Sequence, residues 1–86
     1  MYFTYILECV DKTLYIGSTN NLEKRLHKHN HLKGGAHYTK IRRPVVLKYF
    51  KRFRTYAKSR AKEALWKRLT RDEKLKLIEK IDINKI

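Results

Sequence analysis

The stretch that constrains the fold most is residues 2–31, because strand and helix signals follow one another there with only a few residues between them. Tyr2 to Val10 and Thr13 to Gly17 are rich in β-branched and aromatic residues, which favour strands. Only Asp11 and Lys12 separate the two runs, so they predict an antiparallel hairpin with a tight turn. The first run is apolar at both odd and even positions, which indicates a strand covered on both faces.

A helix is predicted directly after this hairpin. Three consecutive residues offer capping oxygens: Ser18, Thr19 and Asn20. Glu23 stands three residues after the last of them, as in a capping box. Leu22 and Leu26 begin an apolar stripe, and Arg25 and His29, one turn apart, fall within the same face. We therefore expect this basic residue and this histidine to lie beside the core.

The length of the turn decides whether Tyr5 and Tyr15 can act together. A two-residue loop would put the two tyrosines on opposite faces of the sheet, whereas a three-residue loop or a bulge would put them on the same face. Asp-Lys is not a favoured pair for a two-residue turn. Both alternatives stay open on the sequence alone.

The second half of the chain adds one strand and two helices. Pro44 opens a strand over Val45 to Phe53, since proline is tolerated at a first strand position. Thr55 caps a second helix, for which helical spacing predicts a sheet-facing stripe of small and apolar residues: Ala57, Ala61, Ala64, Leu65 and Leu69. A capping box from Thr70 to Glu73 starts a last helix with three inward residues: Leu75, Ile78 and Ile81. The sequence thus predicts one α/β domain over residues 1–86, a small three-stranded antiparallel sheet flanked by helices in the order β-β-α-β-α-α.

Asn30 to Lys40 carries two glycines and polar residues, which is typical of a loop, and Arg42-Arg43 follows. The cations of this region could bind a phosphate chain: Lys33, Lys40, Arg42 and Arg43. An ordinary solvated connection fits the sequence equally well.

The charge of the chain indicates a polyanionic partner. Lys and Arg number 22 against 8 Asp and Glu, a formal net charge of +14, and the basic residues occur along the whole sequence. Such a charge on a small domain favours nucleic acid, and no basic segment has the bulky apolar face that a membrane partner needs. Cys9 is expected in the core, and we find no signal peptide or membrane-spanning run, so a cytoplasmic location is expected.

Several motifs, in order, resemble those of the GIY-YIG nucleases. Phe3-Thr4-Tyr5 stands where that family has Gly-Ile-Tyr, and Tyr15-Ile16-Gly17 matches its second triplet at the expected distance. Arg25, His29 and, further on, Glu63 follow at family spacing. Residues 33–36, 42–44 and 60–71 resemble the small stand-alone members.

The resemblance implies a site for phosphodiester hydrolysis. Tyr5 or Tyr15 would take a proton from water, which requires nearby cations to lower a phenol pKa of about 10. Arg25 would hold the scissile phosphate, and His29 would assist proton transfer or bind phosphate. Glu63 would bind one divalent cation, Mg²⁺ or Mn²⁺, since such hard cations accept a single carboxylate together with water and phosphate.

Gly17 and Ser18 complete the expected site as residues that contact the nucleic acid, with Gly17 letting backbone approach closely. Two of these residues depart from the family's pattern: Phe3 replaces the glycine of the first motif, and Ser18 stands where some members have lysine. Glu63 could also simply form a surface pair with Lys67 one turn away. Two functions are therefore expected. The first is a metal-dependent endonuclease that acts on DNA rather than RNA, in repair or recombination, with a protein partner that supplies targeting. The second is a non-catalytic nucleic-acid-binding module.

Overall fold

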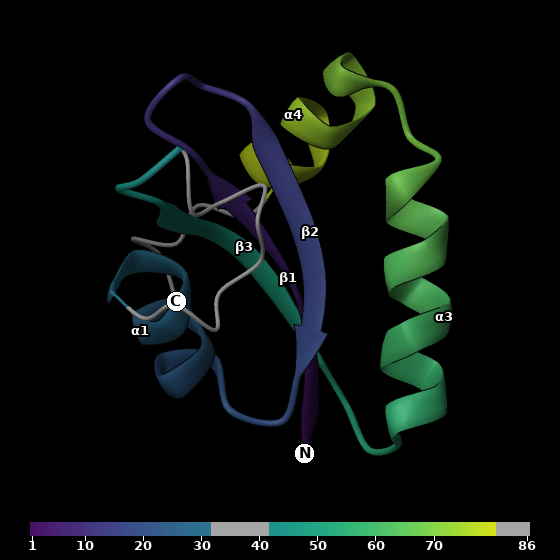
Figure 1. Ribbon diagram of the computed structural model, residues 1–86. Coiled ribbons are helices and arrows are strands. Elements are labelled where there is room, and N and C mark those ends of the chain that lie inside the picture. Colours follow the sequence, from purple (N-terminus) through teal and green to yellow (C-terminus); the bar gives the residue numbers. More distant parts are fainter. Residues whose placement is uncertain (32–41, 81–86) are drawn as a thin grey trace.

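The computed structural model describes residues 1–31 and 42–80. These residues form the predicted series β-β-α-β-α-α (Figure 1). The strands are β1 (Tyr2–Glu8), β2 (Leu14–Thr19) and β3 (Val46–Phe53). The helices are α1 (Leu22–His31), α3 (Tyr56–Lys67) and α4 (Arg71–Lys80). The predicted fold class is confirmed, although β1 stops at Glu8, β2 runs on to Thr19 and β3 starts at Val46.

β1 is the middle strand of an antiparallel sheet with the order β2-β1-β3. Figure 1 looks onto β2, with α1 beside one face of the sheet and α3 beside the other. Four consecutive residues of β1 are at most 2 % exposed: Thr4, Tyr5, Ile6 and Leu7. The prediction of a strand covered on both faces is confirmed.

Each face of the sheet has its own apolar cluster. On the α1 side the buried members are Tyr5, Leu7, Cys9 and Val45, and Leu22 and Leu26 of α1 pack against them. On the other side they are Ile6, Ile16, Tyr49 and Trp66. Alternate residues of β1 therefore serve different clusters, as the pleat of a strand dictates. Cys9 is a core residue, as predicted, and burial raises the pKa of its thiol.

The hairpin has a three-residue loop, Val10 to Lys12. Cys9 N–H donates to the Thr13 carbonyl at 2.9 Å and Lys12 N–H to the Cys9 carbonyl at 2.9 Å, while Lys12 adopts a left-handed φ of 70°. A type I turn followed by a left-handed residue is the common form of such a loop. The resulting register pairs Tyr5 with Gly17 and Leu7 with Tyr15. Tyr5 and Tyr15 therefore lie on the same face, and the alternative left open by the sequence is settled.

The N-cap of α1 is Asn21, and the prediction of Asn20 is wrong. The Lys24 N–H donates to Asn21 Oδ1 at 3.0 Å, and the Asn21 N–H donates to the hydroxyl of Thr19 at 3.1 Å. Thr19, the last residue of β2, thus holds Asn21 in the capping position. The helix continues through Asn30 to His31, so it ends later than the predicted start of the loop. The remainder of that loop lies outside the described residues.

α3 begins as predicted, since the Thr55 hydroxyl accepts from the Lys58 N–H at 3.2 Å. Its predicted sheet-facing stripe is wrong. Four of the five stripe residues are exposed: Ala57, Ala61, Ala64 and Leu65. The buried residues of α3 are Ser59 and Trp66, which lie on the opposite side of the helix. The reason is area: one indole ring, packed 5.3 Å from the ring of Tyr49, buries more apolar surface than several alanines.

α4 starts with the predicted capping box. The Thr70 N–H donates to Glu73 Oε1 at 3.0 Å, and the Glu73 N–H donates to Thr70 Oγ1 at 3.2 Å. Ile78 packs against the core together with Leu77, whereas Ile81 lies outside the described residues. No helix within residues 1–31 and 42–80 has both the length and the apolar character needed to cross a membrane.

Candidate active site

The candidate residues gather around Gly17, in the outer strand β2. The side chain of Tyr5 crosses β2 at this glycine, and a Cβ atom built on Gly17 would lie 2.4 Å from Tyr5 Oη and 2.6 Å from its Cζ. Real side chains do not approach so closely. Gly17 is thus needed because the side chain of the buried Tyr5 passes next to it. The sequence instead predicted that a glycine here would let the nucleic acid approach the backbone.

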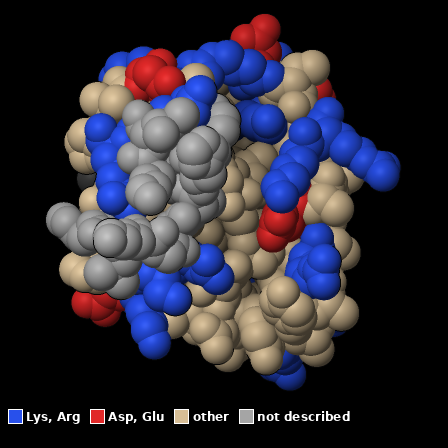
Figure 2. Space-filling model, viewed as in Figure 1, with Lys and Arg blue, Asp and Glu red and all other residues tan. Residues whose placement is uncertain are grey.

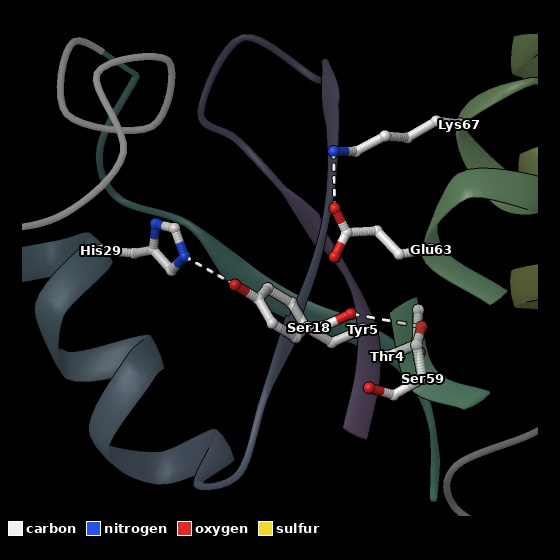
Figure 3. Close-up of polar contacts among 7 residues, drawn as sticks. All are labelled: Thr4, Tyr5, Ser18, His29, Ser59, Glu63 and Lys67. Carbon is white, nitrogen blue, oxygen red and sulfur yellow. Dashed lines mark hydrogen bonds and ion pairs between the residues drawn. The ribbon is translucent and has the colours of Figure 1, made fainter. Parts of the chain in front are cut away.

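Tyr5, Tyr15 and His29 form a compact cluster on the α1 side of β2. Tyr5 Oη lies 3.0 Å from His29 Nε2 (Figure 3). The ring centroids of Tyr15 and His29 are 5.1 Å apart with an interplanar angle of 63°, and those of Tyr5 and Tyr15 are 6.5 Å apart. His29 is fully buried and Tyr5 is 2 % exposed, while Tyr15 is half-buried. Of the two phenols, Tyr15 is the one accessible to water.

The electrostatics of the cluster keep its buried members neutral. Burial raises the pKa of Tyr5 far above its ordinary value of 10, and the neighbouring Tyr15 and Glu63 add to this, although the charge of Arg25 opposes it. Arg25 thus lowers the pKa of Tyr5, as expected, but burial outweighs its effect. Burial also lowers the pKa of His29 to about 4, helped by the charges of Arg25 and Arg43. A neutral imidazole can accept the Tyr5 O–H at Nε2.

Arg25 places a positive charge next to this cluster. It projects from α1, is half-buried, and lies beside Tyr5 where α1 meets the sheet. It also borders a hollow of about 250 Å³ at one end of the sheet. The other walls of this hollow come from the start of β1, the end of β2 with the loop after it, and the start of α3: Tyr2, Ser18, Thr19, Asn20 and Tyr56. Arg25 thus lines this hollow from the α1 side.

Glu63 reaches β2 from the opposite side, out of α3 (Figure 3). Burial alone would raise the pKa of its carboxyl, but the hydrogen bond from Lys67 and the nearby hydroxyl of Ser18, together with the charges of Lys67 and Arg60, lower it below the ordinary value. Glu63 is therefore ionised at neutral pH. The pair with Lys67 considered from the sequence does form, at 2.7 Å from Lys67 Nζ to Glu63 Oε2.

Ser59 fixes the position of α3 and hence of Glu63. Its carbonyl accepts the hydroxyl of Thr4 at 2.7 Å and that of Ser18 at 3.3 Å, so one turn of α3 is tied to both β1 and β2. Glu63 follows Ser59 by one turn, which aims its carboxylate at Ser18. Sequence reasoning missed Ser59. The available signal was the helical spacing of Ser59, Glu63 and Trp66, which a search for apolar stripes does not detect.

The donor set suits one hard cation. Among the described residues, no group of three or more histidine, cysteine or acidic side chains comes together, so Glu63 supplies a single carboxylate beside the Ser18 hydroxyl. Mg²⁺ and Mn²⁺ accept such a site when water and substrate phosphate complete the shell. A cation there has to share Glu63 with Lys67 or displace it.

The other predicted nucleic-acid contacts lie elsewhere. Lys33 and Lys40 are outside the described residues. Arg42 Nε donates to Asp11 Oδ2 in the hairpin loop at 3.0 Å. Arg43 donates to the last carbonyls of α1, those of Lys28 at 3.0 Å and of His29. Both arginines join the chain before β3 to its neighbours, and their binding of phosphate stays a prediction.

The surface around the site is basic. Figure 2, seen from the same side as Figure 1, shows an uncharged hollow over β2 that is bordered mostly by lysine and arginine side chains, with acidic atoms also at its edge. Such a border attracts a polyanion toward the strand at which the candidate groups meet.

Comparisons with known proteins found the following similarities. A family model described as the GIY-YIG catalytic domain matches residues 1–76. A UPF0213 protein of Syntrophus aciditrophicus is 51% identical over 77 residues, which is 90% of this chain and 88% of the relative. One from Clostridium perfringens is 49% identical over 78 residues, covering 91% and 83%. The solution NMR structure of a UPF0213 protein from Bacillus halodurans superposes with a TM-score of 0.59 at 35% identity, covering 92% of this chain and 84% of that one.

Proposed function

This chain belongs to the GIY-YIG catalytic domain family, and from that premise we propose that it is a divalent-metal-dependent endonuclease that hydrolyses phosphodiester bonds, in DNA rather than RNA. The observation that carries the proposal is the gathering of two tyrosines, His29, Arg25 and Glu63 from both sides of β2 around Gly17. A role in DNA repair or recombination, with a protein partner for targeting, and a cytoplasmic location belong to the same proposal.

Tyr15, as its phenolate, takes the proton of the attacking water in this scheme and becomes the neutral phenol. It is half-buried on the outer strand, whereas Tyr5 is 2 % exposed and bonded to His29. Tyr5 and His29 act as positioning residues, because their hydrogen bond fixes the imidazole against which the Tyr15 ring packs at 5.1 Å. The proton acceptor is thereby held in one orientation.

Arg25 and Glu63 complete the site from opposite sides. Arg25 holds the scissile phosphate through the charge of its guanidinium group. Glu63, with Ser18 beside it, holds Mg²⁺ or Mn²⁺. When bound, the cation neutralises charge on the phosphate and on the leaving oxygen.

A second candidate is a nucleic-acid-binding module without catalysis. One observation favours it: Lys67 already occupies Oε2 of the only carboxylate that the described part of the chain brings to Ser18. A charge of +14 would bind nucleic acid under either function, so binding does not separate them.

Cleavage separates the two functions. Labelled single-stranded, duplex and branched DNA, and RNA, are incubated with Mg²⁺, with Mn²⁺ or with a chelator. We expect cleavage that the chelator and Glu63→Gln abolish while binding persists, and that survives Glu79→Gln, a matched change of an exposed glutamate on α4. Binding of every substrate without cleavage under either metal contradicts the nuclease and leaves the binding module.

A further inference from the structure

Two tyrosines and an arginine form a partly exposed stack at one end of the molecule, in which Tyr2 is half-buried. Tyr2 opens β1 and Tyr56 opens α3, and both elements begin at the same end (Figure 1). Their ring centroids are 5.5 Å apart with a 46° tilt. The guanidinium carbon of Arg60, one turn along α3, lies 5.6 Å from the centre of the Tyr56 ring.

The stack is not part of the core. Tyr56 is 50% exposed and Arg60 is exposed, whereas the aromatic pair that serves the core on this side of the sheet is Tyr49 with Trp66, which are 8% and 4% exposed. A side chain with half of its surface in water contributes little apolar burial. The aromatic surface at Tyr56 is therefore available to a ligand.

The stack adjoins the candidate active site. Tyr2 and Tyr56 line the same hollow of about 250 Å³ as Arg25 and Ser18. Arg60 also acts on Glu63, since its charge contributes to the lowered pKa of that carboxyl. A polynucleotide with one phosphate at Arg25 would thus have a neighbouring nucleotide over the tyrosines.

We propose that Tyr2, Tyr56 and Arg60 form a subsite for an unpaired nucleobase next to the scissile phosphate. The substrate is accordingly a single-stranded segment, or the single-stranded side of a junction, and not continuous duplex. This inference rests on the proposed function. Aromatic rings and guanidinium planes stack on the faces of bases, and within a duplex those faces are covered by neighbouring pairs. Because every base has such a face, the subsite discriminates strandedness and not sequence.

Binding without cleavage tests the subsite. A short labelled single strand, the same strand with abasic sites, and a blunt duplex of equal length are titrated with protein at one salt concentration in the presence of a chelator. The abasic strand keeps its phosphates, so any loss of affinity reports the bases. We expect the base-containing strand to bind roughly 5- to 150-fold more tightly, the range that stacking of one base provides.

Matched variants locate the effect. Tyr56→Leu should remove most of the preference for bases, and Tyr56→Phe should keep it, because the ring and not the hydroxyl stacks. Phe50→Leu makes the same kind of change at an exposed aromatic residue of β3, at 42% exposure, and should leave the preference intact. Equal binding of base-containing and abasic strands by the wild type overturns the inference, as does a preference that survives Tyr56→Leu.

The outcome is independent of catalysis. A preference for bases that depends on Tyr56, found in a protein that cuts nothing with Mg²⁺ or Mn²⁺, supports the subsite and contradicts the nuclease. Metal-dependent cleavage of duplex and single strand alike, with Tyr56→Leu unchanged in binding, overturns the subsite and leaves the nuclease standing.

Discussion

Replacing Gly17 by alanine should destabilise the protein because of a single side chain. The new methyl group would lie 2.4 Å from Tyr5 Oη and 2.6 Å from Cζ. Tyr5 has nowhere to move, since it is 2 % exposed and bonded to His29 at 3.0 Å. Either the ring leaves its rotamer or β2 shifts away from β1.

The expected cost follows from this overlap. Overpacking of a filled core costs about 1–3 kcal/mol, and the stiffer unfolded chain of an alanine variant returns about 0.4–1 kcal/mol. The net loss of unfolding free energy is then up to about 2.6 kcal/mol, or a fall of up to roughly 20 °C in Tm for a domain of this size. Loss of the hydrogen bond between Tyr5 and His29 would add about 1 kcal/mol.

Urea unfolding of four proteins isolates the cause: the wild type, Gly17→Ala, Tyr5→Leu and the double variant. Leucine at position 5 is too short to reach Gly17. Gly17→Ala should therefore cost stability beside Tyr5 and cost nothing, or stabilise slightly, beside leucine, which gives a coupling energy of about 1 kcal/mol or more. An equal cost of Gly17→Ala in both backgrounds would refute the assignment of Gly17 to the Tyr5 ring.

Three further predictions concern the charges and the packing around the site. His29 has a pKa of about 4 in the folded protein against 6.5 ordinarily, so on acidification the unfolded chain takes up a proton at this histidine before the folded protein does. The free energy of unfolding should therefore be highest above pH 6.5 and fall by up to about 3 kcal/mol toward pH 4. In urea titrations His29→Gln should flatten this pH dependence, and an unchanged slope contradicts the prediction. Lys67→Gln removes the partner of the Glu63 carboxylate, so it should raise the pKa of Glu63. It should also lower the Mg²⁺ concentration for half-maximal cleavage by roughly 1.5- to 5-fold, the range that a partly exposed ion pair provides. An increased Mg²⁺ requirement would show that Lys67 helps to bind the metal. Trp66→Ala should cost about 3–5 kcal/mol of unfolding free energy and Leu65→Ala about 0.5 kcal/mol or less. A larger cost for Leu65→Ala than for Trp66→Ala would show that α3 packs with the face that the sequence predicts.

The fold was predictable where local signals and topology agree. Strand propensity, a short turn and the capping box at Thr70 are properties of neighbouring residues, and they predicted every described element. The hairpin register was not predictable, because it depends on Lys12 adopting a left-handed conformation that lysine rarely takes. Only this choice brings Tyr5 and Tyr15 to one face.

The face of α3 that packs on the sheet shows why the rest of the site could not be predicted from the sequence. Periodicity counts apolar positions equally, so four exposed residues outweighed the single Trp66. The true face carries Ser59 and Glu63, whose positions are set by hydrogen bonds to β1 and β2 and have no apolar signature. For the same reason Glu63 was identified as a candidate site residue only through the resemblance to a known family. Its neighbour Ser18 was predicted to contact nucleic acid but not to lie beside Glu63.

The most direct test of the account is whether groups from the two sides of β2 work as one catalytic unit. Single-turnover cleavage is measured for the wild type, Arg25→Gln, Glu63→Gln and the double variant, with binding measured separately. If both groups act in one transition state, each single change slows cleavage by about 10²- to 10³-fold, and the double variant is slower than the worse single one by no more than about tenfold. Effects that multiply, or a single change that leaves the rate intact, would contradict a site built across β2 from Arg25 and Glu63.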